Sequence, residues 1–352
     1  MARRKSLSRR NKIQPAVMTL AFQLPIGATQ STIDLSQVAS LVNRRFYRQG
    51  INWAVAGFKV ISPAGVTGSM SIAQLPNTWV MSNAWEKSFQ TWQKMNREAM
   101  EETPSIRPKF LDFKIYADTT QHQAGFQGNL LPVDFAGQPY DRGEWFASKA
   151  VVPFGPASPG NTAEFEFVAT GPNFPGASAV TGFNAVSLIE GYAASRSLPY
   201  SEDPNTPVDA DDASGSTPEN WMSAIFNTGT DQVSEVLESM VDENNIAPYP
   251  FEGDGVHVDT MYPGGANQGN GLQIHDFEFV TGTTIGGTTR LKGGNFPCGL
   301  IELGYLLSGA EPEEEFNLLI DLVPGNHRGY LCEPMTEMWV IAILLLSVTL
   351  GS

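Results

Sequence analysis

The sequence predicts an all-β protein: a single jelly-roll β-sandwich with inserted helices and long loops. Three observations predict this fold. Short apolar or alternating segments recur along the chain, and turn-rich stretches separate them. Gly and Pro number 34 and 24 among 352 residues, which favours short strands joined by turns over a helical bundle. Hydrophobic residues make up 41% of the chain, enough to bury a sizeable core.

The first strand is predicted over residues 18–24, where apolar side chains alternate with Thr19, Ala21 and Gln23. The other predicted strands span residues 51–61, 67–73, 111–115, 144–152, 163–168, 272–280, 300–307, 316–323 and 338–350. The last of these is an apolar run shorter than the roughly 20 residues of a membrane-spanning helix. We therefore expect a buried strand or packing segment there and no membrane contact, with a tail anchor as the alternative.

Three helices are predicted, at residues 83–100, 185–195 and 230–243. Asn83 and Glu86 form a cap-like start for the first. Apolar stripes on the first and third are typical of core packing rather than of cofactor binding. Three segments are expected: a disordered basic arm at residues 1–14, a jelly-roll domain at 15–352 and, within it, an exposed acidic loop at 198–220.

Charge is distributed unevenly along the chain. The net charge is −15, yet the first twelve residues contain no acid and six basic side chains: Arg3, Arg4, Lys5, Arg9, Arg10 and Lys12. Lys and Arg in a flexible segment neutralise phosphates without reading base sequence, so the arm is predicted to bind nucleic acid. A nuclear localisation signal is a second role, compatible with the first.

A second basic cluster, Arg44, Arg45 and Arg48, is interleaved with Phe46 and Tyr47. Arginine together with aromatic residues suits single-stranded nucleic acid, because bases stack on rings while phosphates pair with guanidinium groups. The alternative is a surface or interface patch whose two aromatic residues belong to the core.

The motifs of common enzymes are missing, so catalysis is not expected. None of the four histidines belongs to an HExxH pair, and no GxSxG nucleophile elbow occurs. The segment 282–289 is similar to a phosphate-binding loop, but Thr288 stands where that loop requires Lys. Carboxylates that converge from distant parts of the chain to hydrolyse a glycoside stay an open alternative.

No cofactor is expected. Cys298 and Cys332 are too few for a disulfide framework or a four-ligand zinc site, and are predicted to be ordinary buried thiols. Asp209, Asp211 and Asp212 are candidate ligands for a structural calcium ion, and a solvated acidic loop is the alternative.

Five segments of the first half of the chain are distinctive: NRRFYRQG (43–50), LPNTWVMSNAWEKSF (75–89), RPKFLDFKIYAD (107–118), NLLPVDF (129–135) and GEWFASKAVVP (143–153). These segments resemble capsid proteins of small circular Rep-encoding single-stranded DNA viruses; bacilladnavirus-like and unclassified members are the narrower alternatives. The resemblance covers roughly residues 1–155.

The resemblance implies a jelly-roll subunit that assembles into an icosahedral shell, with the arm facing inward on single-stranded DNA bound without sequence preference. It places the protein in the virion, and in the host nucleus during assembly; the receptor stays open. About 60 arms would supply roughly 360 charges against about 2,000 genome phosphates, so additional cations, more subunits or the 44–48 arginines must contribute. The alternatives are a carbohydrate-binding or carbohydrate-active jelly-roll protein and a non-viral nuclear nucleic-acid-binding protein.

Overall fold

The computed structural model describes residues 15–101, 112–153, 162–172, 176–197, 221–225, 271–281, 287–309 and 315–338. Several predicted features lie outside this part of the chain. They are the arm at 1–14, the acidic loop at 198–220 with Asp209, Asp211 and Asp212, the helix at 230–243, and all but Met338 of the run at 338–350.

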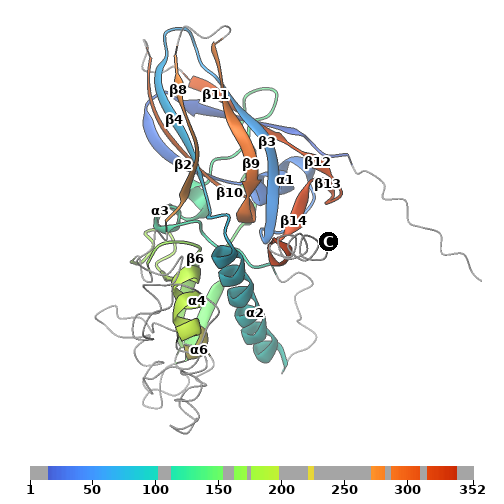
Figure 1. The fold of residues 1–352 in the computed structure, drawn as a ribbon, viewed down its shortest axis with the longest axis vertical. Helices are drawn as coiled ribbons and strands as arrows, with labels where there is room; N and C mark the ends of the chain where they lie inside the picture. The colour runs from blue at the N-terminus through green and yellow to red at the C-terminus, as the bar shows by residue number, and fades with distance from the viewer. Residues whose placement is uncertain are drawn as a thin grey trace, which may run out of the picture.

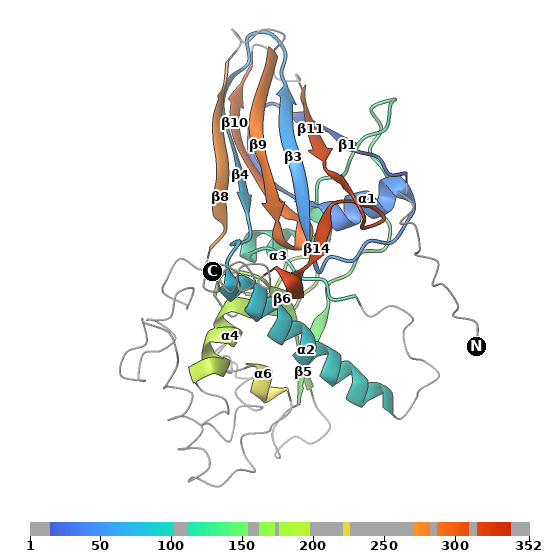
Figure 2. The same cartoon turned by 45° about the vertical axis from the view of Figure 1, so that its right-hand side comes forward.

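Two antiparallel sheets form a sandwich, as the sequence predicted for an all-β protein (Figures 1 and 2). One sheet contains β1 (Thr19–Pro25), β11 (Glu315–Leu322), β3 (Ile51–Ile61), β9 (Thr288–Phe296) and β14 (Cys332–Pro334). The other contains β2 (Ala28–Asp34), β10 (Leu300–Ser308), β4 (Thr67–Gln74) and β8 (Gln273–Val280). Their order is β1-β11-β3-β9, with β14 also on β3, and β2-β10-β4-β8.

The eight long strands pair in a nested pattern. The first pairs with the eighth (β1 with β11), the second with the seventh (β2 with β10), the third with the sixth (β3 with β9) and the fourth with the fifth (β4 with β8). Every one of these pairs is antiparallel. This pattern is that of one long hairpin whose successive strand pairs alternate between the two sheets.

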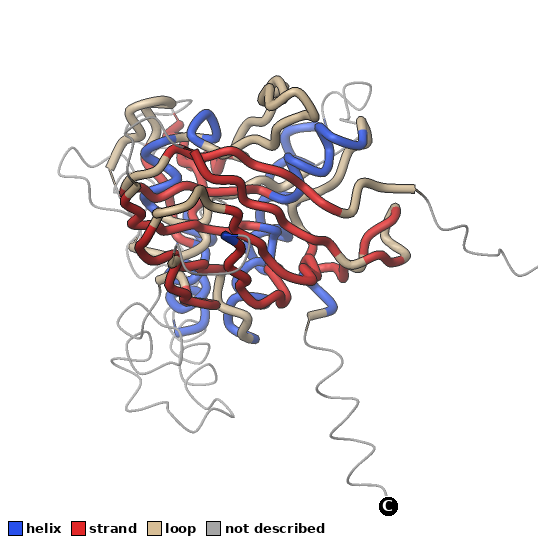
Figure 3. The backbone as a smooth tube through the Cα atoms, turned by 90° about the horizontal axis from the view of Figure 1, so that it is seen from above, coloured by secondary structure: helices blue, strands red, loops and turns tan. Residues whose placement is uncertain are grey.

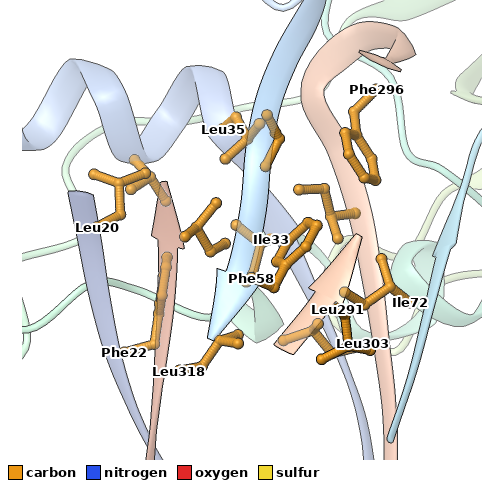
Figure 4. Packing of buried hydrophobic residues seen from close by; sticks show 14 of the residues in the cluster. Leu20, Phe22, Ile33, Leu35, Phe58, Ile72, Leu291, Phe296, Leu303 and Leu318 are labelled. Carbon is orange, nitrogen blue, oxygen red and sulfur yellow. The ribbon is translucent and has the colours of Figure 1, made fainter. Parts of the chain in front are cut away.

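Alternating side chains explain why the two sheets adhere. In β1, Leu20, Phe22 and Leu24 are buried while the residues between them point outward. They join Ile33, Phe58, Ile72, Leu291, Leu303 and Leu318 in one apolar cluster between the sheets (Figure 4). Apolar side chains therefore fill the interior of the sandwich.

The connections between strands carry the helices. The α1 helix (Leu35–Asn43) joins β2 to β3. Between β4 and β8 lies a long insertion with eight described elements: α2 (Trp79–Glu101), α3 (Thr119–Ala124), η2 (Phe126–Gly128), β5 (Lys149–Pro153), β6 (Thr162–Val168), β7 (Asn184–Ser187), α4 (Leu188–Ser197) and α6 (Trp221–Ala224). The remaining short elements are η4 (Pro297–Gly299), β12 (Pro324–Gly325), β13 (Gly329–Tyr330) and η5 (Met335–Glu337).

The insertion has a hydrophobic core of its own below the sandwich (Figure 1). Strands β5, β6 and β7 form its small sheet, in which β6 and β7 run parallel. Trp85 and Trp92 of α2 pack with Phe113 and Phe167 in this second cluster. Cys298 and Leu300 of the sandwich belong to the same cluster, so the two cores are joined.

Some predicted boundaries are wrong. The first predicted helix begins at Trp79, where the Thr78 hydroxyl accepts from the Met81 amide, so Asn83 lies inside the helix and not at its cap. Residues 185–187 belong to β7, and the second helix starts only at Leu188. The strand predicted at 144–152 begins at Lys149. Residues 112–115 form no strand, although Tyr116 bridges Val168.

A buried carboxylate holds the sandwich and the insertion together. Asp34 is the N-cap of α1, and its Oδ1 accepts from the amides of Ser36 and Gln37 at 2.9 and 3.2 Å. Its Oδ2 accepts from Gln49 Nε2 at 3.0 Å and from the insertion's Trp145 Nε1 at 2.9 Å. Burial raises the pKa of Asp34 to about 6, although these donors oppose the rise.

Replacing Asp34 with Asn is expected to destabilise the fold by about 2–4 kcal/mol at pH 7, because the new amide N–H would face the donors of Gln49 and Trp145. A pH signature is also expected. The Asp34 carboxyl has a pKa of about 6 in the folded chain and of 3.8 in the unfolded chain. The folded chain therefore binds more protons between these two pH values, and stability falls as the pH rises through this window. Between about pH 5.2 and about pH 7.5, the free energy of unfolding measured with urea should decrease in both proteins, and the decrease should be about 1 kcal/mol smaller in D34N than in wild type.

Asp321→Asn is the control, because its hydrogen bond with Lys59 lowers the pKa of Asp321 and moves its titration below this window. An equal decline in D34N and wild type would assign the pH dependence to another group.

Candidate nucleic-acid interface

The described chain begins beside the second arginine cluster. Arg45 donates from Nη1 to the Pro15 carbonyl at 2.9 Å, and the Val17 amide donates to Asn43 Oδ1 at 3.0 Å. The Tyr330 hydroxyl donates to the Val17 carbonyl at 2.7 Å, so the entry also lies against β13 (Figures 1 and 3). The basic residues 3–12, outside the described part, are thus joined to the fold at this cluster.

The end of α1 places the arginines. Arg44 caps the helix in a left-handed conformation, with φ 52° and ψ 40°, and its amide donates to the Ser40 carbonyl. This turn directs the chain away from the helix axis. Arg44 and Arg48 are exposed, whereas Arg45 is half-buried and contacts Pro15. The structure therefore brings the three predicted arginines into one short surface segment.

The two aromatic residues of this segment have different roles. Tyr47 is fully buried: its ring lies 5.8 Å from Trp53 and 5.5 Å from Tyr330, and its hydroxyl donates to the Arg328 carbonyl at 3.1 Å. Burial raises the pKa of Tyr47. The core alternative is thus correct for Tyr47, which fixes the segment to the fold and is not available for stacking.

Phe46, by contrast, is 37% exposed. The Lys114 ammonium lies 5.5 Å from its ring centre and 4.5 Å from that of Trp145. This arrangement is a cation–π contact from a largely buried lysine, whose ammonium is also paired with Asp112 at 2.8 Å. Phe46 is therefore the aromatic residue of the cluster that fits the predicted role.

A fourth arginine, Arg328, was missed by the sequence interpretation. It lies in the β12–β13 turn with φ 51°, and its guanidinium donates to the Phe46 carbonyl. It is 280 residues from Arg48, and only the strand pairing brings the two together, so no local signal could have revealed it. None of the ion pairs between described residues involves Arg44, Arg45, Arg48 or Arg328.

A second surface feature lies on the outer face of the β2-β10-β4-β8 sheet. Phe279 pairs with Ser69, which pairs with Leu306, while Phe277 pairs with Ser71, so these side chains share one face. Four large apolar side chains are exposed there: Ile274 (73%), Phe277 (48%), Phe279 (68%) and Leu306 (64%). We call these four residues the outer apolar face.

The described residues were also compared with the requirements for a metal site and for a membrane-spanning helix. Among these residues, no group of three His, Cys, Asp or Glu side chains is placed to hold a metal ion, and no helix is long and apolar enough to span a membrane. Cys298 is buried and Cys332 half-buried, and both are free thiols, as predicted. Burial raises the pKa of both thiols.

Comparison with models of known protein families, with curated protein sequences and with solved structures gave no match to this chain.

Replacing Arg44 and Arg48 together with Ala is expected to weaken the salt dependence of binding to oligo(dT). Each phosphate contact on a single strand contributes about 0.7 to the slope of log K against log salt, so the slope should fall by about 1.4. Arg45 is kept because it holds Pro15. Fluorescence anisotropy at several salt concentrations measures the slope.

Arg290→Ala is the matched control, since this exposed arginine on β9 pairs with Lys59, near the end of β3 that lies farthest from the cluster. A double variant with the wild-type slope would mean that the cluster makes no phosphate contact.

Proposed function

We propose that the protein is a viral capsid subunit that assembles into a closed icosahedral shell and encloses single-stranded DNA. The observation that carries the proposal is the nested strand order, which supports the jelly-roll interpretation of the sandwich. A jelly roll is the common building block of such shells, although lectins and cupins also use it. The other features of the chain favour the shell among these uses.

The interior of the sandwich argues against a binding lumen. A ligand site between the two sheets would need a cavity with polar groups, whereas here apolar side chains such as Phe22, Phe58 and Phe296 fill that space. The distinctive groups lie on the outside: the outer apolar face and the arginines near Pro15. Exposed apolar and basic groups of this kind fit a subunit that binds other subunits and DNA through its surface.

The outer apolar face supplies a driving force for assembly. Large exposed apolar patches mark interaction surfaces, and each Phe or Leu side chain buried between subunits contributes about 1.5–3 kcal/mol. A second copy of the chain is the partner proposed for this face. Repeated in a closed symmetric shell, such a contact is made by every subunit.

The basic arm and the 44–48 arginines would couple assembly to packaging. Both carry positive charge, and they meet at Pro15. Because the remainder of the chain is acidic, single-stranded DNA would be attracted to this side of the subunit alone, through phosphate contacts that release counterions. The shell would then close around the strand with this side inward.

Changing Phe277 and Phe279 to Ser is expected to abolish shell formation without unfolding the chain, because both side chains are largely exposed in the subunit. Negative-stain microscopy of the purified full chain should show uniform spheres for wild type and only small species for the double variant. Circular dichroism reports whether the fold is kept.

Leu331→Ser is the control, since Leu331 is also exposed but lies outside the outer apolar face. Wild-type chain that stays monomeric across a range of salt would contradict the proposed function. Normal shells from the double variant would show only that assembly uses another face.

Deleting residues 2–12 is expected to remove most DNA from purified particles while the fold and the shell persist, because six cations per subunit are lost. The ratio of absorbance at 260 and 280 nm and nuclease-protected DNA measure the content. Replacing the six basic residues of the arm with Gln keeps the full length and should lower the DNA content to the same extent. Unchanged DNA recovery would exclude the arm from packaging.

A further inference from the structure

A cavity of about 440 Å³ opens next to the arginine cluster. Its wall includes Phe46 and Arg48 from the segment after α1, Trp85 and Phe89 from α2, and Arg328 from the β12–β13 turn. It thus lies where the sandwich, the insertion and the β12–β13 turn meet. This volume is within the range of small-molecule sites and large enough for one nucleotide.

Flat aromatic rings form the inner wall of the cavity. The rings of Trp85 and Phe89 are stacked, with centroids 4.9 Å apart and an interplanar angle of 22°. Phe113 meets Trp85 edge-on at 6.1 Å and lies 5.9 Å from Phe89. A wall of this kind favours a flat, aromatic ligand.

One polar atom of this wall lacks a partner. Trp85 is only 4% exposed, and its indole Nε1 has no hydrogen-bond acceptor among the described residues. Buried donors are nearly always satisfied, so this N–H is expected to have an acceptor from outside the described residues, and a ligand in the cavity that Trp85 lines is one source of it. A nucleobase combines a flat ring with carbonyl and ring-nitrogen acceptors.

The outer part of the cavity is positively charged. Arg48 and Arg328 both line it, and no carboxylate of the described chain forms an ion pair with either. Asp112 also lines the cavity, but it is paired with Lys114 at 2.8 Å. His327 contributes no charge near pH 7, because burial and Arg328 lower its pKa. An anion is therefore favoured beside the aromatic wall.

We propose that this cavity binds one nucleotide unit of single-stranded DNA, with the base against the Trp85 and Phe89 wall and a phosphate between Arg48 and Arg328. The proposal deepens the proposed function and rests on it. Every base has a π face, so such a site holds a strand without reading its sequence. Each subunit would then grip the bases as well as the phosphates of the strand that the arm attracts.

The test compares two oligonucleotides of equal length and charge, oligo(dT) and its abasic counterpart, on the full-length protein by fluorescence anisotropy. Wild type should bind oligo(dT) at least about tenfold more tightly than the abasic strand. Phe89→Leu keeps apolar volume but removes the flat ring, so it should reduce this preference severalfold and leave abasic binding unchanged. Phe135→Leu is the matched control, because Phe135 is a fully exposed ring outside the cavity.

Equal binding of the two strands by wild type would overturn the nucleotide site, and that comparison does not depend on any variant folding. It is also the result expected if the apolar residues after Met338, which follow the cavity residue Thr336, fill the space. Salt-dependent binding of both strands would then still support packaging. A chain that binds neither strand and forms no shell would instead overturn the proposed function itself.

Discussion

The Asp34 carboxylate is the interaction on which the rest of this structure depends. A buried charge must be matched by donors, and its four donors come from α1, from Gln49 before β3 and from Trp145 in the insertion. Gln49 in turn exchanges two hydrogen bonds with the backbone of Ile115, at 2.7 and 3.0 Å. The arginine segment lies between α1, whose first turn this carboxylate caps, and Gln49, which donates to it. The surface that we propose to contact DNA is therefore shaped from inside the protein.

The junction between the sandwich and the insertion contains further buried polar groups, and one of them makes its stability depend on pH. A chain of amides runs from Gln37 through Asn129 to Gln121, at 2.9 and 2.8 Å, and joins α1 to α3. On the outer face of β10, burial and contact with Asp118 raise the pKa of Glu302 to about 7. As at Asp34, the folded chain keeps this proton at pH values where the unfolded carboxyl has already lost it. The free energy of unfolding that both groups contribute therefore decreases as the pH rises towards their pKa values in the folded chain. These two carboxyl groups therefore contribute more to stability in mildly acidic solution than above pH 7.

The order of apolar and polar residues in the sequence predicted strands such as β1, β3 and β11. In these strands apolar residues alternate with polar ones or form a continuous run, which is sufficient to show which side chains are buried. The same patterns missed β2 and β9. The sequence of β2, ATQSTID, is mostly polar, and that of β9, TTRLKGGNF, contains two glycines. Both segments form strands because they pair with β10 and β3 respectively. Helix α1 was missed because it is short, and it begins only where Asp34 caps it. For the site, the sequence identified Arg44, Arg45 and Arg48 but gave Tyr47 the same role as Phe46. Arg328 and the α2 aromatics could not be added, because only the tertiary fold brings them to Arg48.

The position of the basic groups matters more here than their number. The chain as a whole carries a net charge of −15 and would repel a polyanion at long range. At physiological salt, however, a charge acts over only about 8 Å, so a strand of DNA responds to the groups within reach and not to the total. The hydrogen bond from Arg45 to Pro15 places the root of the arm directly beside the exposed Arg44 and Arg48. Under the proposed function, phosphates drawn to the arm would arrive at the cluster and at the aromatic cavity next to it, while the acidic remainder of the chain would disfavour DNA elsewhere. The proposed function thus gives an acidic protein one side for single-stranded DNA, and assigns its outer apolar face to other subunits.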